Sequence, residues 1–472
     1  MAANFLHGVE TIEIQKGAKS IKVVKSAVIG LVGIAPEGEA NNPILVTSEK
    51  DAAQFGAQVP GFSIPQSLDA IFKQGAGTVI VVNVFKEDEH TLLVEDESHQ
   101  ITNGKTKLAN APIGDIEIKE GGNPTSYQKD VDYSIDAFGN FKTIGSGISE
   151  GATLTFNYKK LNDAAITAPV ITGSIDSGTG VRTGSKCFEL SFNMFGFTPK
   201  ILIAPTFSDV PAVSANMISL AESLKAIAYI DAPYGTTVSD AIEARGPLGT
   251  IGFNTSSKRA ELLYPHLKVS NPDPAETGEL LFPYSAFLAG VRAAVDNDEG
   301  YWFSDSNHEI KGIIGVERQI TAGISDANTE SNLLNEAGIT TLFNSFGSGI
   351  RVWGNRSASY PSYTGPDNFV CVRRTADIIH ESVEQACLQF IDRPITQGWI
   401  DSVRESVNSF LRTLQGRGAI IDGVCKYNPD DNPAVELAQG HVTFTIDFMP
   451  PTPAERITFN SFINIEYLNN LA

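Results

Sequence analysis

Apolar residues recur at helical spacing in two adjacent segments near the end of the chain, residues 373–390 and 397–415. Each set places its apolar side chains on one face, which predicts two amphipathic helices. Gly416 and Gly418 follow the second segment and predict its end. The apolar positions are Ala376, Ile379, Val383, Ala386, Cys387 and Phe390 in the first helix, and Ile400, Val403, Val407, Phe410, Leu411 and Leu414 in the second.

The pattern then changes to the period of two that is typical of a half-buried strand. Residues 441–449 alternate in this way, and so do Ile463, Ile465 and Tyr467 after the proline-rich break at residues 450–453. A strand so close to the C-terminus needs a sheet to join. It can pair within its own molecule, or it can be added to the sheet of a neighbouring copy, where main-chain hydrogen bonds supply affinity.

The earlier part of the chain alternates continuous apolar strands with helical segments. The strands are clearest at residues 28–34 and 78–85, and the alternation resumes at about residue 200. This β-α-β rhythm predicts a largely parallel, doubly wound sheet. Residues 87–195 instead show short alternating runs, turn residues and no convincing helix. They predict an all-β module inserted into the α/β core, where surface loops tolerate additions.

We therefore expect a multi-domain α/β protein with an α+β C-terminal part, because 472 residues are too many for one core. The expected segments are an N-terminal arm (1–20), a first α/β part (21–86), an inserted all-β outer domain (87–195), the main α/β domain (196–365), a C-terminal domain of two helices plus strands (366–458) and a C-terminal arm (459–472).

Composition excludes several classes of function. The formal charge is −20, from 35 basic and 55 acidic residues, and so acidic a surface repels phosphate backbones and argues against a nucleic-acid binder. The N-terminus lacks the features of a signal peptide, and no stretch approaches the roughly 18 apolar residues of a membrane helix. We expect folding in a cytoplasm without membrane insertion. Four widely spaced cysteines indicate reduced, mostly buried thiols.

Motifs that suggest enzymes are better explained as ordinary structure. Residues 147–151 match the G-x-S-x-G pattern, but a strand follows where a nucleophile elbow needs a helix. Residues 178–186 have the order G-S-K, where a phosphate loop has G-K-[ST]. His380-Glu381 lacks the second histidine of a zinc helix, and no motif gives His266 or His308 the role of a base. We expect no catalytic, cofactor or metal site.

Several runs at the two ends of the chain share their order and spacing with a known family. They are RRTADI (373–378), FIDRP (390–394), QGRGA (415–419) and PPTPAERI (450–457) in the C-terminal part, and FLHGVE (5–10), AVIGLVGIAP (27–36), PILV (43–46) and FG (55–56) in the N-terminal part. No single run is decisive, but together they resemble the sheath proteins of contractile tails. The resemblance covers both ends and much of the middle.

The resemblance implies a structural subunit, not an enzyme, whose middle domain is subtilisin-like in topology. Such subunits polymerise helically around a tail tube, contract after a baseplate signal and drive the tube through the host envelope without a nucleotide. The implied partners are further copies of the chain, the tail tube protein, and baseplate and tail terminator proteins. The implied location is the virion tail, assembled in the cytoplasm of a host bacterium.

The family also implies roles for particular residues. Its terminal arms weave adjacent subunits together, and its C-terminal domain lines the inside of the sheath and touches the tail tube. The corresponding inter-subunit strand residues here are Val9, Ile12, Ile14, Ile463, Ile465 and Tyr467, and the tube-facing candidates are Arg404, Glu405, Arg412 and Arg417. The sheath of a phage-derived bacteriocin or extracellular injection system is an alternative. An α/β hydrolase or nucleotide-binding enzyme is the alternative from another class.

Overall fold

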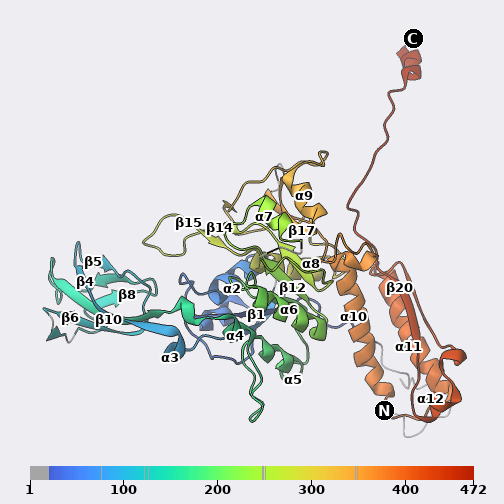
Figure 1. The fold of residues 1–472 in the computed structure, drawn as a ribbon, viewed down its shortest axis with the longest axis horizontal. Coiled ribbons are helices and arrows are strands. Elements are labelled where there is room, and N and C mark those ends of the chain that lie inside the picture. The colour runs from blue at the N-terminus through green and yellow to red at the C-terminus, as the bar shows by residue number, and fades with distance from the viewer. Residues whose placement is uncertain are drawn as a thin grey trace, which may run out of the picture.

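The computed structural model describes residues 21–75, 77–121, 123–125, 127–246, 249, 251–345, 347 and 349–471. Its centre is an eight-stranded sheet with the order β18-β17-β13-β12-β11-β1-β3-β2 (Figure 1). The six inner strands are parallel, and β2 and β18 are antiparallel edges. The strands are β1 Val28–Gly33, β2 Ile44–Val46, β3 Thr78–Asn83, β11 Ile201–Ile203, β12 Ile227–Asp231, β13 Ala260–Leu263, β17 Ile339–Ser345 and β18 Gly349–Trp353.

Helices cover both faces of this sheet, as the doubly wound prediction requires. On one face α6 packs Met217 and Leu220 against strand residues such as Ile230. On the other face α2 and α8 contribute Ile71 and Phe287 to a second core. The inner strands are buried from both sides, which explains their continuous apolar sequence. The helices are α1 Glu49–Ala52, α2 Ile64–Phe72, α6 Pro211–Leu224, α7 Val238–Glu243, α8 Tyr284–Asp298 and α9 Glu330–Glu336.

The inserted β module lies at one end of the molecule, attached through a narrow neck (Figure 1). The helical turn α3 Glu87–His90 leads into it, and its first and last long strands pair so that Thr91 lies opposite Leu161. Its own core includes Phe141, Phe156 and Tyr158. The two sheets have the orders β4-β10-β6-β7 and β5-β9-β8. The strands are β4 Thr91–Gln100, β5 Lys105–Lys107, β6 Ile113–Glu120, β7 Asn123–Pro124, β8 Tyr133–Ile135, β9 Asn140–Thr143 and β10 Thr153–Leu161.

The prediction of strands without helices up to residue 195 was wrong for its last third. Residues 163–195 form α4 Ala168–Thr172, α5 Ser191–Phe195 and two 3-10 turns. Ile171 and Phe188 from this stretch are buried in the core beneath the main sheet. Short, turn-rich helices give too weak a periodicity to be recognised in sequence. The packing favours an end of the β module near Leu161, and the domain boundaries themselves stay predictions.

A small sheet of β14 Leu267–Ser270, β15 Glu279–Phe282 and β16 Gly315–Val316 extends from the main domain toward the module. At the tip of its hairpin, Asp273 accepts hydrogen bonds from Lys107 Nζ at 2.7 Å and from Asn140 Nδ2 at 2.8 Å. Lys107 also pairs with Glu276 at 2.6 Å. The module is therefore braced at a second point besides its neck.

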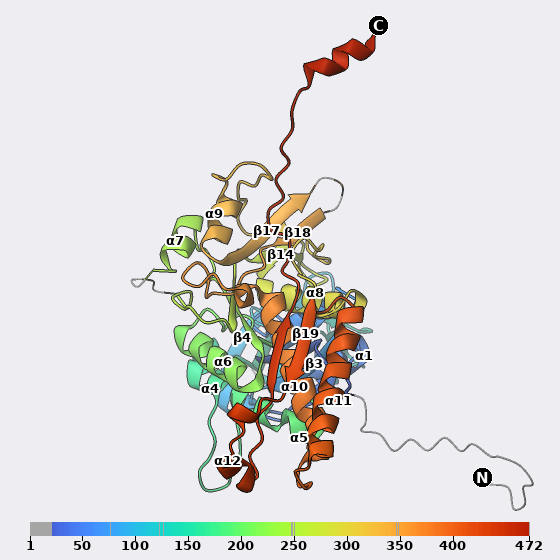
Figure 2. The same cartoon turned by 90° about the vertical axis from the view of Figure 1, so that its right-hand side faces the viewer.

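The C-terminal part lies at the opposite end from the module (Figures 1 and 2). Two long helices, α10 Val370–Cys387 and α11 Gln397–Gly416, pack against the antiparallel pair β19 Asp422–Lys426 and β20 Thr445–Met449. The short helix α12 Ala434–Ala438 belongs to the connection from β19 to β20. Both helices were predicted from their apolar spacing and are confirmed. Their shared core includes Ile379, Phe410 and Leu414.

Candidate assembly surfaces

Residues 456–471 form an arm that leaves the body of the molecule (Figures 1 and 2). Every described side chain from residue 454 to 470 is exposed. Ile463 is 104% exposed, Ile465 75% and Tyr467 71%. So many apolar side chains in water are unfavourable, at about 25 cal/mol per Å² of apolar surface, which makes the arm a candidate contact surface.

The predicted terminal strand is not formed within this chain. Residues Ile465–Leu471 form a 3-10 helix instead, and Tyr467 N–H donates to Asn464 C=O at 3.3 Å. An alternating segment becomes a strand only where a sheet edge can pair with its backbone. No such edge contacts the arm in the described part of the molecule, so a local helical turn replaces the strand. Pairing with its own sheet is not what the structure shows.

A sheet with unpaired edges lies on the C-terminal domain. Strands β19 and β20 form a sheet of two strands in the described residues, with Cys425 opposite Ile446. Their inward side chains, among them Cys425 and Phe448, pack on α10 and α11. Two strands alone are marginal in water, and unpaired edges are templates for strand addition.

The two edges of this sheet are not equivalent. On the β19 side, Asn408 of α11 places its amide against the backbone of Cys425. Its Oδ1 accepts from Cys425 N–H at 2.7 Å, and its Nδ2 donates to Cys425 C=O at 3.0 Å. The amide thus occupies the hydrogen-bonding position that a further strand would use. The β20 edge has no comparable cap among the described hydrogen bonds.

The tube-facing candidates lie on the exposed side of α11 and at its end. Arg404 pairs with Asp401 at 2.9 Å, and Arg412 pairs with Glu405. Arg417 is the C-cap residue. The structure therefore brings Glu405 and Arg412 together and leaves Arg404 and Arg417 at other positions along the helix. Pairs this exposed contribute only about 0–1 kcal/mol each.

A charged stripe joins the C-terminal domain to the main sheet, and the sequence analysis missed it. Along α10, Arg374, Asp377, Glu381 and Glu384 follow one another at spacings of three and four, on one helix face. Each pairs with a residue at the amino-terminal edge of the parallel sheet or the end of an adjoining helix. The pairs are Arg374–Asp296, Asp377–Arg259, Glu381–Lys200 and Glu384–Lys225.

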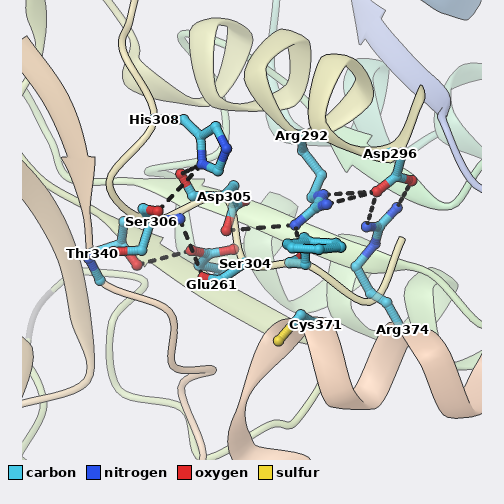
Figure 3. Close-up of polar contacts among 12 residues, drawn as sticks. Glu261, Arg292, Asp296, Ser304, Asp305, Ser306, His308, Thr340, Cys371 and Arg374 are labelled. Carbon is cyan, nitrogen blue, oxygen red and sulfur yellow. Dashed lines mark hydrogen bonds and ion pairs between the residues drawn. The ribbon is translucent and has the colours of Figure 1, made fainter. Parts of the chain in front are cut away.

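The stripe is buried at one end and exposed at the other. Arg374 donates both terminal nitrogens to Asp296, at 2.8 and 2.7 Å, in the interior beneath α8 (Figure 3). Arg292, which is fully buried, donates to the same carboxylate at 2.9 Å. Burial opposes ionisation of Asp296, but Arg374 and Arg292 outweigh it and hold its pKa below the ordinary value. Glu384, at the far end, is largely exposed.

Glu261 lies close to this network with little to compensate a charge (Figure 3). Its Oε1 accepts from Thr340 Oγ1 at 2.8 Å, whereas its Oε2 has no hydrogen-bond partner. Burial raises the pKa of Glu261 well above its ordinary value, and the Asp305 carboxylate raises it further. The surroundings of Glu261 therefore disfavour its ionised form.

Among the described residues of the main domain, no hydrogen bond between a serine hydroxyl and a histidine ring suggests a nucleophile–base pair. Ser285, at the start of α8, donates its N–H and Oγ to the carboxylate of Asp231 at 2.8 and 2.5 Å and is fully buried. His266 instead lies 3.4 Å from Glu317. Residues 147–151 form the predicted turn between β9 and β10. Within the described residues, no cluster of three His, Cys, Asp or Glu side chains could hold a metal.

Comparison with known proteins matches these features to one family. Family models match residues 26–84 (tail sheath protein Gp18 domain III N-terminal region), 180–358 (phage tail sheath protein central domain) and 367–464 (phage tail sheath C-terminal domain). The tail sheath protein of Burkholderia phage BcepMu is 46% identical over 476 residues, covering 100% of this chain and 99% of that protein. This chain belongs to the phage tail sheath family.

A more distant relative and a solved structure agree. The tail sheath protein of Escherichia phage P2 is 25% identical, with 99% of this chain and 98% of the relative covered. The contracted helical sheath of the anti-feeding prophage has the same fold, with a TM-score of 0.61 at 16% identity over 98% of this chain and 100% of that one. The chain is thus a structural subunit of a contractile sheath and a component of the virion tail.

The residues that suggested the family largely fall inside the matched ranges. The runs at 27–36 and 43–46 lie in the first matched range, and those at 373–378 and 450–457 lie in the last. The N-terminal candidates Val9, Ile12 and Ile14 lie outside the described residues. No described helix is long and apolar enough to cross a membrane.

Proposed function

We propose that this subunit polymerises by giving its C-terminal arm to the β19–β20 sheet of a neighbouring copy. One observation supports this most directly. Within the described residues, the same chain has an apolar arm without a sheet and a two-stranded sheet without further strands. Donor and acceptor are different surfaces, so each copy can donate and accept at once. Such head-to-tail pairing produces an open helical array instead of a closed dimer.

The acceptor edge in this proposal is β20. Asn408 already satisfies the backbone of Cys425 on the β19 side, so a strand arriving there would have to displace two hydrogen bonds. Ile463, Ile465 and Tyr467 are the residues proposed to enter the neighbouring sheet. On pairing they gain backbone partners and cover for their apolar side chains.

The N-terminal arm is proposed to link a further copy through Val9, Ile12 and Ile14. The first described residues lie against the C-terminal domain, which supports a position of the N-terminal arm's base there. Val23 and Val24 pack against the α10–α11 core, and Val24 N–H donates to Ser382 Oγ at 3.1 Å. Both arms would then begin near the surface that accepts arms from neighbours.

The proposed work of the assembled sheath is mechanical. Subunits surround a tail tube in an extended lattice, a baseplate signal releases them, and they repack into a shorter, wider lattice that drives the tube through the host envelope. The proposed partners are the tube, baseplate and tail terminator proteins, with Arg404, Glu405, Arg412 and Arg417 facing the tube. Weak exposed charge pairs suit a contact that must break on contraction.

We further propose that the protein is not an enzyme, uses no cofactor or nucleic acid, and assembles in the cytoplasm of the host bacterium. The internal use of Ser285 as a donor to Asp231 supports the first point. The sheath of a bacteriocin or extracellular injection system is a second candidate, favoured by the fold shared with the anti-feeding prophage sheath. A capsid gene beside the coding sequence would decide for a phage.

Electron microscopy of the overexpressed protein tests the proposal. The wild type should form long hollow tubes, and the variant with Ile463, Ile465 and Tyr467 changed to serine should give soluble monomers with unchanged circular dichroism. The matched control changes Leu92 and Leu93 of the module, which are also exposed, to serine and should form tubes. Normal tubes from the arm variant would reject the strand-exchange mechanism.

A further inference from the structure

The root of the C-terminal arm is fixed to the main domain, although the arm emerges from the C-terminal domain. After β20 ends at Met449, the chain passes Pro450, Pro451 and Pro453. Proline fixes the backbone φ angle and stiffens such a segment. Glu455 then pairs with Arg356, which lies between β18 and α10.

Arg356 is held in place before Glu455 reaches it. Its guanidinium lies 4.3 Å from the ring centre of Tyr360 and 4.1 Å from that of Phe369. Its Nη1 donates to Asn368 Oδ1 at 2.8 Å, and its side chain is only 16% exposed. An arginine fixed by two rings and an amide loses little further freedom on binding a carboxylate.

Glu455 binds this guanidinium with both carboxylate oxygens. Oε1 accepts from Nε at 3.0 Å, and Oε2 accepts from Nη2. A bidentate pair fixes direction as well as distance. Among the described residues, no hydrogen bond or ion pair joins residues 456–471 to the body of the molecule, so the pair marks the boundary between the fixed root and the free arm.

We propose that Arg356 and Glu455 are positioning residues that aim the free arm toward the neighbouring subunit. This inference rests on the proposed strand exchange. The three prolines act as a stiff strut from β20, and the pair fixes the far end of that strut. The free part, from Arg456 onward, therefore starts from a defined point on the main domain and searches a smaller volume than an arm freely hinged at Met449.

Trypsin cleavage of the unassembled protein tests the pair directly. Arg456 is the last basic residue, so cleavage after it releases residues 457–472 as one peptide. A protease binds several residues on both sides of the cleaved bond in an extended, accessible conformation. Because Glu455 is held by Arg356, the residues before the bond cannot readily adopt that conformation. Arg356→Gln leaves the cleaved sequence unchanged and should speed release about tenfold, as expected for loss of a charge-assisted bidentate pair.

Two further variants control this result. Arg412→Gln removes an exposed arginine from another carboxylate pair and should leave release at the wild-type rate. Arg356→Lys keeps the charge without the fork and should give an intermediate rate, and it substitutes for the glutamine variant should that one fail to fold by circular dichroism. Equal release rates for the wild type and both Arg356 variants would refute the claim that the Arg356–Glu455 pair fixes the root of the arm.

Tube assembly separates this inference from the proposed function. Arg356→Gln should raise the concentration needed for tubes about tenfold, because its arm starts from a less defined position. Faster release with an unchanged assembly threshold would overturn the aiming role. A wild type that forms no tubes, while the release rates still differ, would refute the strand exchange and leave the fixed root established.

Discussion

Removal of the Asp377 carboxylate tests the charged stripe that joins α10 to the main domain. Asp377 binds both terminal nitrogens of Arg259, and its side chain is 4% exposed. It also accepts from Arg373 at 2.7 Å. In the variant Asp377→Ala, Arg259 stays buried and loses its main partner. Its remaining carboxylate, Glu222, is 72% exposed and largely solvated.

The expected loss of stability follows from that geometry. Breaking a buried ion pair by removing one partner costs about 3–5 kcal/mol, because the other charge remains uncompensated. Glu222 offsets part of this, so the lower end, about 3 kcal/mol, is expected. The matched control is Asp401→Ala, which removes an aspartate paired with Arg404 on the exposed face of α11. It should cost no more than about 1 kcal/mol.

Guanidinium unfolding of the unassembled protein, followed by tryptophan fluorescence, measures the difference in stability between Asp377→Ala and Asp401→Ala. Trp302 reports on the C-terminal core and Trp353 on the main sheet. Equal unfolding midpoints for Asp377→Ala and Asp401→Ala would refute the stripe as a stabilising joint. Replacing both Arg259 and Asp377 by apolar residues of similar volume should be less harmful than the single change, because Arg259 is then no longer left as an uncompensated buried charge.

Three further results are expected. Glu261→Gln should stabilise the protein at pH 7 and not at pH 4. Because the pKa of Glu261 is raised in the folded state, its contribution to stability is present below its ordinary pKa of 4.5 and is lost as the pH rises, by about 1.4 kcal/mol per pH unit. Unfolding measured at a series of pH values will show this loss. Deletion of residues 92–160 with a glycine linker should leave the rest folded by circular dichroism, because Thr91 and Leu161 are paired, whereas deletion of 87–195 should unfold it by removing Phe188 from the core. Burial raises the thiol pKa of Cys371 to about 12, so Ellman's reagent at pH 8 should react with it only after denaturation.

The main sheet and the two C-terminal helices were predictable because their patterns are local. A buried parallel strand reads as a continuous apolar run, and α10 shows its apolar face at helical spacing over 18 residues. The helical spacing of the charged residues on α10 is also present in the sequence, but their ion-pair partners cannot be identified from it. Arg259 and Asp377 are 118 residues apart, and sequence alone does not show that they meet.

The candidate assembly site was predictable only in part. The alternation of Ile463, Ile465 and Tyr467 drew attention to a terminal segment whose apolar side chains are exposed in the structure. In the proposed strand exchange the sheet that pairs with this segment belongs to another copy, and the single molecule shows a 3-10 helix instead. Asn408 acts through its contact with Cys425, and Glu455 through its contact with Arg356. The pattern of apolar and polar residues predicts neither contact.

The amide of Asn408 has a consequence for any polymer built from this chain. In the proposed lattice its two hydrogen bonds to the backbone of Cys425 favour β20 as the edge that accepts the C-terminal arm, so every seam made by that arm points the same way. Such a filament has two chemically different ends, one with empty β20 edges and one with unused arms. Growth can then be begun by one protein and stopped by another without either binding the wrong end.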